Sequence, residues 1–189
     1  MTSPWLARHL LKQAGWTARL DVPLPERCVI VAEPHTSNWD GWYLVLGSLV
    51  LDLKLRWMIK AEANRAPWGK LLSATGALYV ERGKGGSVQA AADAFQGASR
   101  MRVAIAPSGT RKRTDHWHTG FLRIARMANV PIALGYVDYD RCEVGIGMVL
   151  DSSLPDDELQ ATMARFYATK TARRPECASD VHFGKREKA

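Results

Sequence analysis

The sequence holds few cysteines and no long hydrophobic run. Three cysteines among 189 residues are an odd number, spaced too widely for a disulfide framework or a zinc-binding pattern, so we expect a reducing compartment. No stretch reaches the roughly 20 apolar residues that span a bilayer, and polar residues interrupt any signal-peptide pattern near the N-terminus. We therefore expect neither a membrane-spanning helix nor a cleaved leader.

Internal repeats and low-complexity linkers are also absent, and 189 residues suffice for one domain with a full hydrophobic core. Positive charge is in excess: the formal net charge is +7, and basic residues concentrate between residues 54 and 84 and between residues 100 and 126. This balance favours anionic partners such as nucleic acid, anionic lipid or phosphorylated substrates, although a solvated basic surface has the same composition. The seven tryptophans suit either a core or a membrane interface.

The first twenty residues carry an amphipathic helical pattern. A helix over residues 3–20 would place Leu6, Leu10, Leu11 and Trp16 on one face. Such a helix lies in the plane of a membrane surface or packs on the domain, and the sequence leaves both interpretations open. We define residues 1–24 as this N-terminal helical segment and as a candidate membrane-surface anchor.

Short apolar runs then alternate with helical patterns. The predicted strands are residues 28–32, 55–59, 77–80, 102–106, 132–138 and 143–148. The predicted helices are residues 38–52 (capped by Ser37 or Asn38), 67–74, 87–97, 120–129 and 155–172, followed by a charged, frayed tail over residues 171–189. The alternation predicts a single-domain, layered α/β fold with a mixed, mostly parallel sheet flanked by helices. Functional residues are then expected in loops at strand ends.

The loop after the first apolar strand holds His35 and Asp40. On one continuous helix the two side chains would point in different directions, but Pro34 and the helix cap place His35 before the helix and Asp40 in its first turn. An aspartate that contacts the imidazole fixes its tautomer and leaves the other nitrogen free to take a proton. The pair predicts a general base for an alcohol, although the helix dipole alone also favours an aspartate there.

A second polar loop, Ser108-Gly109-Thr110-Arg111, follows the predicted strand over residues 102–106. Gly109 permits close approach of the backbone to a ligand, and Arg111 supplies a planar fork suited to a phosphate group. Thr110 adds a hydroxyl donor. The loop has the composition of an oxyanion or phosphate cradle, and equally that of a basic surface turn.

Two more segments complete a pattern: residues 76–82, which end in Arg82, and residues 130–132, which read Val-Pro-Ile. In order, residues 35–40, 76–82, 108–111 and 130–132 resemble the four blocks of the 1-acylglycerol-phosphate (lysophospholipid) acyltransferase family. Lys60 resembles the lysine that the family carries ahead of its second block. The resemblance extends over roughly residues 28 to 138 and implies a glycerol-phosphate acyltransferase-like fold, with an acyltransferase domain over residues 25–175 and a charged tail over residues 176–189.

The resemblance implies transfer of a fatty acyl group from acyl-CoA or acyl carrier protein to a hydroxyl of a lysophospholipid-type acceptor, in phospholipid biosynthesis or remodelling. His35 would be the general base and Asp40 would orient it, without metal or cofactor. The residues implied in acceptor binding are Lys60, Arg82, Ser108, Gly109, Thr110 and Arg111. We expect no nucleic-acid partner, and a cytoplasmic protein held peripherally on the anionic inner face of the cell membrane.

One position departs from the family. Ser108 stands where the family has a glutamate before Gly-Thr-Arg, and a serine cannot form an ion pair with Arg111. Three alternatives stay open: a serine acyl hydrolase or thioesterase that uses Ser108, a non-catalytic basic lipid-binding relative, and a metal-dependent hydrolase that uses His116 and His118 with His35 and Asp40. For the serine hydrolase, the sequence around Ser108 lacks the Gly-x-Ser-x-Gly elbow that exposes a nucleophilic serine.

Overall fold

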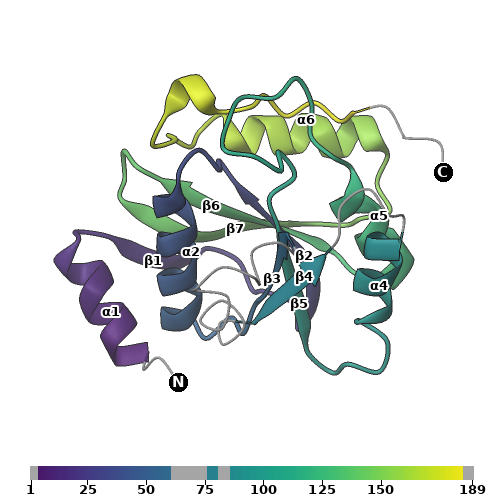
Figure 1. Ribbon diagram of the computed structural model, residues 1–189, viewed down its shortest axis with the longest axis horizontal. Coiled ribbons are helices and arrows are strands. Elements are labelled where there is room, and N and C mark those ends of the chain that lie inside the picture. The colour runs from purple at the N-terminus through teal and green to yellow at the C-terminus, as the bar shows by residue number, and fades with distance from the viewer. Residues whose placement is uncertain (1–3, 61–75, 81–85, 185–189) are drawn as a thin grey trace.

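The computed structural model describes residues 4–60, 76–80 and 86–184, without the side chains of residues 59–60, 77–80 and 86. Its helices and strands follow one another along the chain as Figure 1 shows. They are α1 (Pro4–Gln13), β1 (Thr17–Leu20), β2 (Arg27–Glu33), α2 (Asn38–Val50), β3 (Arg56–Lys60), β4 (Ala77–Val80), α4 (Gly86–Asp93), β5 (Met101–Ile105), α5 (Gly120–Ala128), β6 (Ile132–Asp138), β7 (Glu143–Leu150), α6 (Asp156–Tyr167) and a 3-10 turn (Pro175–Cys177).

The strands form one mixed sheet in the order β1-β7-β6-β2-β5-β3-β4. Only the β6–β7 pair is antiparallel among the described pairs. The predicted α/β fold with a mostly parallel sheet is therefore confirmed. Because β2 to β6 all run in the same direction, their carboxyl ends meet at one edge, where α/β proteins usually bind ligands.

Helices cover both faces of the sheet (Figure 1). Side chains alternate along each strand, so β2 contributes to the core on both faces. On one face Val29 and Val31 of β2 join a buried cluster with α4, α5 and α6. On the other face Cys28 and Ile30 pack with the segment that follows α2, and α1 lies against the outer side of α2 (Figure 1). The sequence pattern of β2, an apolar run without alternation, is what burial on both faces requires.

Six predicted strands are confirmed, each within two residues of its predicted ends. The N-terminal helix, however, is shorter than predicted. It ends at Gln13, Gly15 follows with a left-handed φ of 76°, and Thr17–Leu20 pairs with β7 as an additional edge strand. A glycine in this conformation is a common helix stop, and the open edge of β7 offers backbone partners that no local sequence pattern reveals.

The C-terminal segment also differs from the prediction of a frayed tail. The last helix ends at Tyr167, and the chain then returns over the domain as far as Gly184. Trp117 bonds through its backbone to His182 and Gly184, and Phe183 packs against Phe121 at 5.8 Å. Charge dominated the prediction, whereas two apolar residues in this stretch, Val181 and Phe183, pack against the core. The helix predicted over residues 67–74 lies outside the described residues.

Candidate active site

The site is built where β2 passes into α2. Ser37 is the N-cap of α2, and its hydroxyl accepts a hydrogen bond from the backbone N–H of Trp39 at 3.0 Å. Asp40 stands at the third helical position and completes a capping box, because its carboxylate accepts from the Ser37 N–H. The cap therefore places His35 before the helix and Asp40 in its first turn, as the sequence predicts.

Asp40 is fully buried, with no exposed surface. Its Oδ2 accepts the backbone N–H groups of Thr36 and Ser37, each at 2.6 Å. Its Oδ1 accepts the hydroxyl groups of Ser37, at 3.0 Å, and of Tyr139, at 2.6 Å. Four donors thus hold this carboxylate in one orientation.

His35 lies beside this carboxylate, with Nδ1 at 3.9 Å from Oδ2 of Asp40. The structure brings the pair together but leaves them beyond hydrogen-bond distance, since two backbone N–H groups already occupy Oδ2. Burial lowers the pKa of His35, Arg111 lowers it further, and Asp40 opposes both. The net lowering keeps the imidazole neutral at neutral pH, the form that accepts a proton.

The loop over residues 108–111 reaches the same edge of the sheet. Ser108 is 3% exposed, and its hydroxyl donates to the backbone carbonyl of Thr110 at 3.1 Å. Gly109 adopts a left-handed φ of 66°, and its N–H donates to the carbonyl of Ala106 at 3.0 Å. The turn requires this glycine conformation, and it directs the Ser108 hydroxyl into the loop.

Arg111 links this loop to the helix that carries Asp40. Its guanidinium donates to the side-chain carbonyl of Asn38, the first residue of α2. Arg111 also acts electrostatically on His35. The structure therefore gathers His35, Asp40 and the loop of residues 108–111 into one cluster, with a cation available to an anionic group.

The other two predicted binding residues are placed only in part. Lys60 is the last residue of β3 and pairs with Val80 at the end of β4, on the same edge of the sheet, but its side chain is not described. Arg82 lies outside the described residues. Their roles stay predictions.

Sequence reasoning missed two residues of the site, Glu33 and Tyr139. Glu33 ends β2 and is 4% exposed; its carboxylate accepts the backbone N–H groups of His35 at 2.7 Å and of Ser108 at 3.0 Å. Burial raises the pKa of Glu33 to about 7. Tyr139 follows β6, whose carboxyl end shares the edge with that of β2. An acid that ends an otherwise apolar strand was a usable signal for Glu33, whereas Tyr139 carried none.

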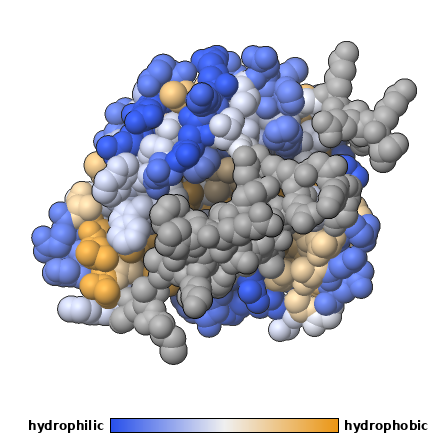
Figure 2. Space-filling model, in the orientation of Figure 1, coloured by the Kyte–Doolittle hydropathy of each residue, from blue (hydrophilic) through white to orange (hydrophobic). Residues whose placement is uncertain are grey.

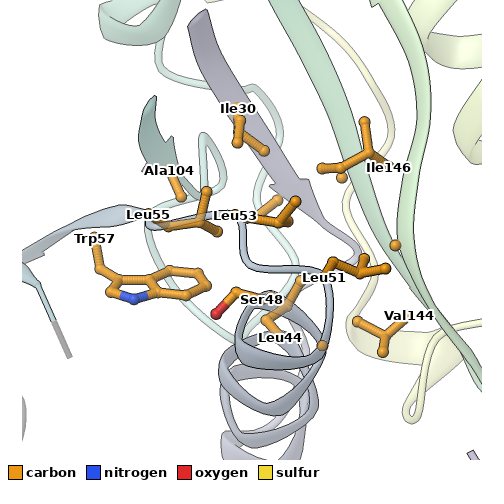
Figure 3. A pocket seen from close by; sticks show the side chains of 14 residues that line it. Ile30, Leu44, Ser48, Leu51, Leu53, Leu55, Trp57, Ala104, Val144 and Ile146 are labelled. Atoms are coloured by element: carbon orange, nitrogen blue, oxygen red, sulfur yellow. The ribbon is translucent and has the colours of Figure 1, made fainter. Parts of the chain in front are cut away.

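A small apolar cavity lies between α2 and the sheet (Figure 3). Leu44 and Ser48 of α2 line one side, Ile30 and Ile146 of the sheet line the other, and the indole of Trp57 reaches across toward Ser48. Its volume of about 20 Å³ holds roughly one water molecule. Ala32, three residues before His35, also lines it, so the cavity lies on the chain segment that leads to the site.

The part of the chain that the structure describes contains no group of three or more histidine, cysteine, aspartate or glutamate side chains placed to hold a metal ion. The rings of His116 and His118 lie edge to face, 5.6 Å apart, and do not combine with His35 and Asp40 into such a group. None of the described helices is both long enough and apolar enough to cross a membrane.

Comparisons with known proteins identify the fold and the family. The crystal structure of the 1-acyl-sn-glycerophosphate (LPA) acyltransferase PlsC from Thermotoga maritima matches with a TM-score of 0.61 and 14% sequence identity, over 90% of this chain and 80% of that chain. At this identity the likeness concerns the fold. A comparison with curated proteins gives no match. A family model described as Acyltransferase matches residues 18–133, more than half of the sequence. The chain belongs to the Acyltransferase family.

Proposed function

We propose that this protein is an O-acyltransferase that moves a fatty acyl group from acyl-CoA or acyl carrier protein to a hydroxyl of a lysophospholipid-type acceptor. One observation carries the proposal: a half-buried His35 with a lowered pKa lies beside the buried Asp40, at the edge of the sheet that Arg111 also reaches. Membership of the Acyltransferase family supplies the reaction class, because it implies an acyl donor and an acceptor.

In the proposed reaction His35 removes the proton of the acceptor hydroxyl. Nδ1 faces Asp40, so the base is Nε2. The acceptor oxygen then bonds to the carbonyl carbon of the thioester, and the carbon–sulfur bond breaks. His35 gives the proton to the departing sulfur, which leaves as a thiol. Asp40 stabilises the transient imidazolium, and its four hydrogen bonds keep it in place during the step.

In this proposal Arg111 binds the acceptor phosphate, together with Gly109 and Thr110 of the same turn. The guanidinium can exchange its neutral partner, the Asn38 amide, for a phosphate, with which it forms stronger, charge-assisted bonds. Lys60 and Arg82 belong to the same proposal on the family resemblance alone. Ser108 contributes through the backbone of the loop, because its hydroxyl is directed to Thr110.

We propose that the fatty acyl chain binds at the apolar cavity between α2 and the sheet. Its lining is almost entirely hydrocarbon, and the one hydroxyl, that of Ser48, donates to the backbone carbonyl of Val45. A fatty acyl chain needs far more space than one water molecule. We infer that side chains at the rim, Trp57 above all, move aside when a chain enters.

Exposed aromatic residues support a peripheral position on a membrane. Trp5 of α1 is 71% exposed, and Trp39 and Trp42 of α2 are about half exposed. Figure 2 shows hydrophobic side chains at the surface over α1, and the guanidinium of Arg173 lies 5.5 Å from the Trp39 ring. Tryptophan with arginine suits the headgroup region of an anionic bilayer. Within residues 1–24 we therefore assign the anchor to α1, which packs on α2, and place it on the inner face of the cell membrane.

The test is acyl transfer by purified protein with labelled acyl-CoA or acyl carrier protein, anionic lipid vesicles and a panel of lysophospholipids. His35→Ala should lower the rate at least ~100-fold, because the base is lost. His182→Ala is the matched control, since this histidine is exposed and its backbone carbonyl, which bonds to Trp117, is unchanged. A His35→Ala rate close to that of wild type would refute the assignment.

The same assay separates the alternatives. A hydrolase would cleave thioester without an acceptor and would lose this activity in Ser108→Ala. Binding of the vesicles without turnover on any donor would indicate a lipid-binding relative. The buried, internally bonded Ser108 hydroxyl does not favour the hydrolase.

A further inference from the structure

Glu33 is a buried carboxylate between the two loops of the site. One carboxylate oxygen accepts the His35 N–H at 2.7 Å, and the other accepts the Ser108 N–H at 3.0 Å. The two bonded residues are separated by 73 positions in the sequence, and each opens one of the loops that the proposed reaction needs. In the described part of the chain, no side-chain carboxylate other than that of Glu33 is recorded as bonding to both loops.

We propose that Glu33 is a positioning residue that locks the His35 loop to the loop of residues 108–111, and that it supplies from β2 the carboxylate that the second loop lacks at Ser108. The proposal rests on the proposed acyl transfer for its effect on rate. The two hydrogen bonds from the His35 and Ser108 N–H groups to Glu33, called the lock below, are a structural property and can be measured without turnover.

The sheet register explains why this position can reach both loops. β2 lies between β5 and β6 and runs parallel to both. Val31 pairs with Ile105 of β5, so the chain beyond Ile105 rises beside the end of β2 and brings the Ser108 N–H to Glu33. The side chain at the last position of this central strand can therefore bond to both loops.

An ionised carboxylate suits this role better than an amide would. Each of its oxygens accepts a backbone N–H, whereas a glutamine would turn an NH₂ group toward one of the two donors. No cationic side chain of the described residues is among the groups that shift the pKa of Glu33. The titratable groups that act on it are Asp40 of α2 and, reciprocally, Tyr167 of α6. The groups that lower the pKa of Glu33 are Ser108, through its side chain and then its backbone N–H, and the backbone N–H of His35. The two N–H groups form the hydrogen bonds that join Glu33 to the loops.

This balance makes the lock sensitive to pH. Burial raises the pKa of Glu33 to about 7, while the bonds from Ser108 and His35 act in the opposite direction. Above neutral pH the ionised carboxylate accepts both N–H groups. Below it, protonation turns one acceptor into a donor and releases one of the loops.

The experiment compares wild type with Glu33→Gln, which keeps the side-chain volume, and with the exposed control Glu158→Gln. In Glu33→Gln we expect kcat for acyl transfer to fall about 10-fold or more, because small displacements of reacting groups are costly. KM for the thioester should change by less than about twofold, because the lock does not contact the donor. A wild-type kcat in Glu33→Gln would overturn the role in catalysis.

Relocation of the carboxylate tests the link to Ser108. Glu33→Ala should lower kcat, and Glu33→Ala/Ser108→Glu should recover a large part of it, since the acid then reaches the His35 N–H from the other loop. Ser108→Glu alone should also lower kcat, because two acids then compete for one buried space. A double variant no more active than Glu33→Ala would overturn the proposed substitution of one position for the other.

NMR of the backbone amides measures the lock directly, in the absence of substrate. In wild type the N–H resonances of His35 and Ser108 should shift together with a midpoint near pH 7, and Glu33→Gln should abolish this shared transition. Independent titrations, or an unchanged transition in Glu33→Gln, would overturn the lock. If wild type transfers no acyl group, the proposed function fails, and the amide titration still decides the role of Glu33.

Discussion

At the scale of single residues, two protonations should shape the acidic limb of the pH profile: that of Glu33, near pH 7, and that of His35, at lower pH. A general base must be neutral, so kcat/KM should rise with pH through the His35 pKa and level off only above the Glu33 pKa. Burial, and then Arg111, hold the His35 pKa below its usual value of 6.5. Removal of the Arg111 charge should therefore raise the His35 pKa.

The prediction concerns Arg111→Gln. The acidic limb of its kcat/KM profile should move to higher pH than that of wild type, in addition to any loss of acceptor affinity. Arg113→Gln is the matched control, because this exposed arginine pairs with Asp180 at 2.6 Å and is not among the groups that shift the pKa of His35. Superimposable acidic limbs for wild type and Arg111→Gln would contradict the argument.

Tyr139 offers a second prediction at this scale. Its hydroxyl donates to the buried Asp40 at 2.6 Å, and Tyr139→Phe removes this donor while it keeps the ring packed against Trp16 and Tyr43. Loss of a hydrogen bond to a buried charge should lower the free energy of unfolding by about 1–3 kcal/mol, measured by urea denaturation. We also expect a lower kcat, because Asp40 loses one of its restraints.

Tyr43→Phe serves as the comparison, since Tyr43 belongs to the same aromatic cluster and donates no recorded bond to Asp40. Equal losses of stability in the two variants would show that the Tyr139 hydroxyl has no special part in holding the carboxylate.

At the scale of elements, α1 combines packing with exposure. Ala7 and Leu11 are buried, whereas Trp5 and Leu6 point to solvent at 71% and 43% exposure. The two interpretations that the sequence left open, a packed helix and a membrane-surface helix, are thus compatible: one side of the helix packs on the domain and the other is free to bind lipid.

The corresponding prediction uses Trp5→Ser/Leu6→Ser. Binding to anionic vesicles in a sedimentation assay should weaken by at least about tenfold, given 1.5–3 kcal/mol for each large apolar side chain transferred from water. Stability should hardly change, because both side chains are exposed. Met127→Ser is the control: Met127 is 49% exposed, but on α5, which packs on the opposite face of the sheet. Equal binding by all three proteins would exclude α1 as the lipid-contacting element.

At the scale of the whole molecule, the returning C-terminal segment closes the fold over α5 and the loop before it. Phe183 packs on Phe121, and its neighbours bond to the backbone of Trp117. Phe183→Ala should lower the free energy of unfolding by about 1–3 kcal/mol, measured in urea, whereas the exposed His182→Ala should not. A Phe183→Ala variant as stable as wild type would show that this segment does not stabilise the fold.

The sequence predicted the alternation of strands and helices, and the two loops at strand ends, with good accuracy. It succeeded because β2, β6 and the start of α2 are specified locally, by apolar runs and by the cap at Ser37. It failed at residues 17–20 and after Tyr167. There the structure depends on a distant strand edge and on a distant apolar surface, which a local pattern does not encode.

What the sequence by itself determined is therefore the identity and spacing of His35, Asp40 and Arg111, and the capped turn that places the first two side by side. Only the tertiary structure decided what holds them. The bond from Tyr139 to Asp40 joins residues 99 positions apart, and that from Ser108 to Glu33 joins residues 75 apart. These partners meet because parallel strands bring their carboxyl ends to one edge of the sheet, and the order of strands in a sheet is fixed by packing between them.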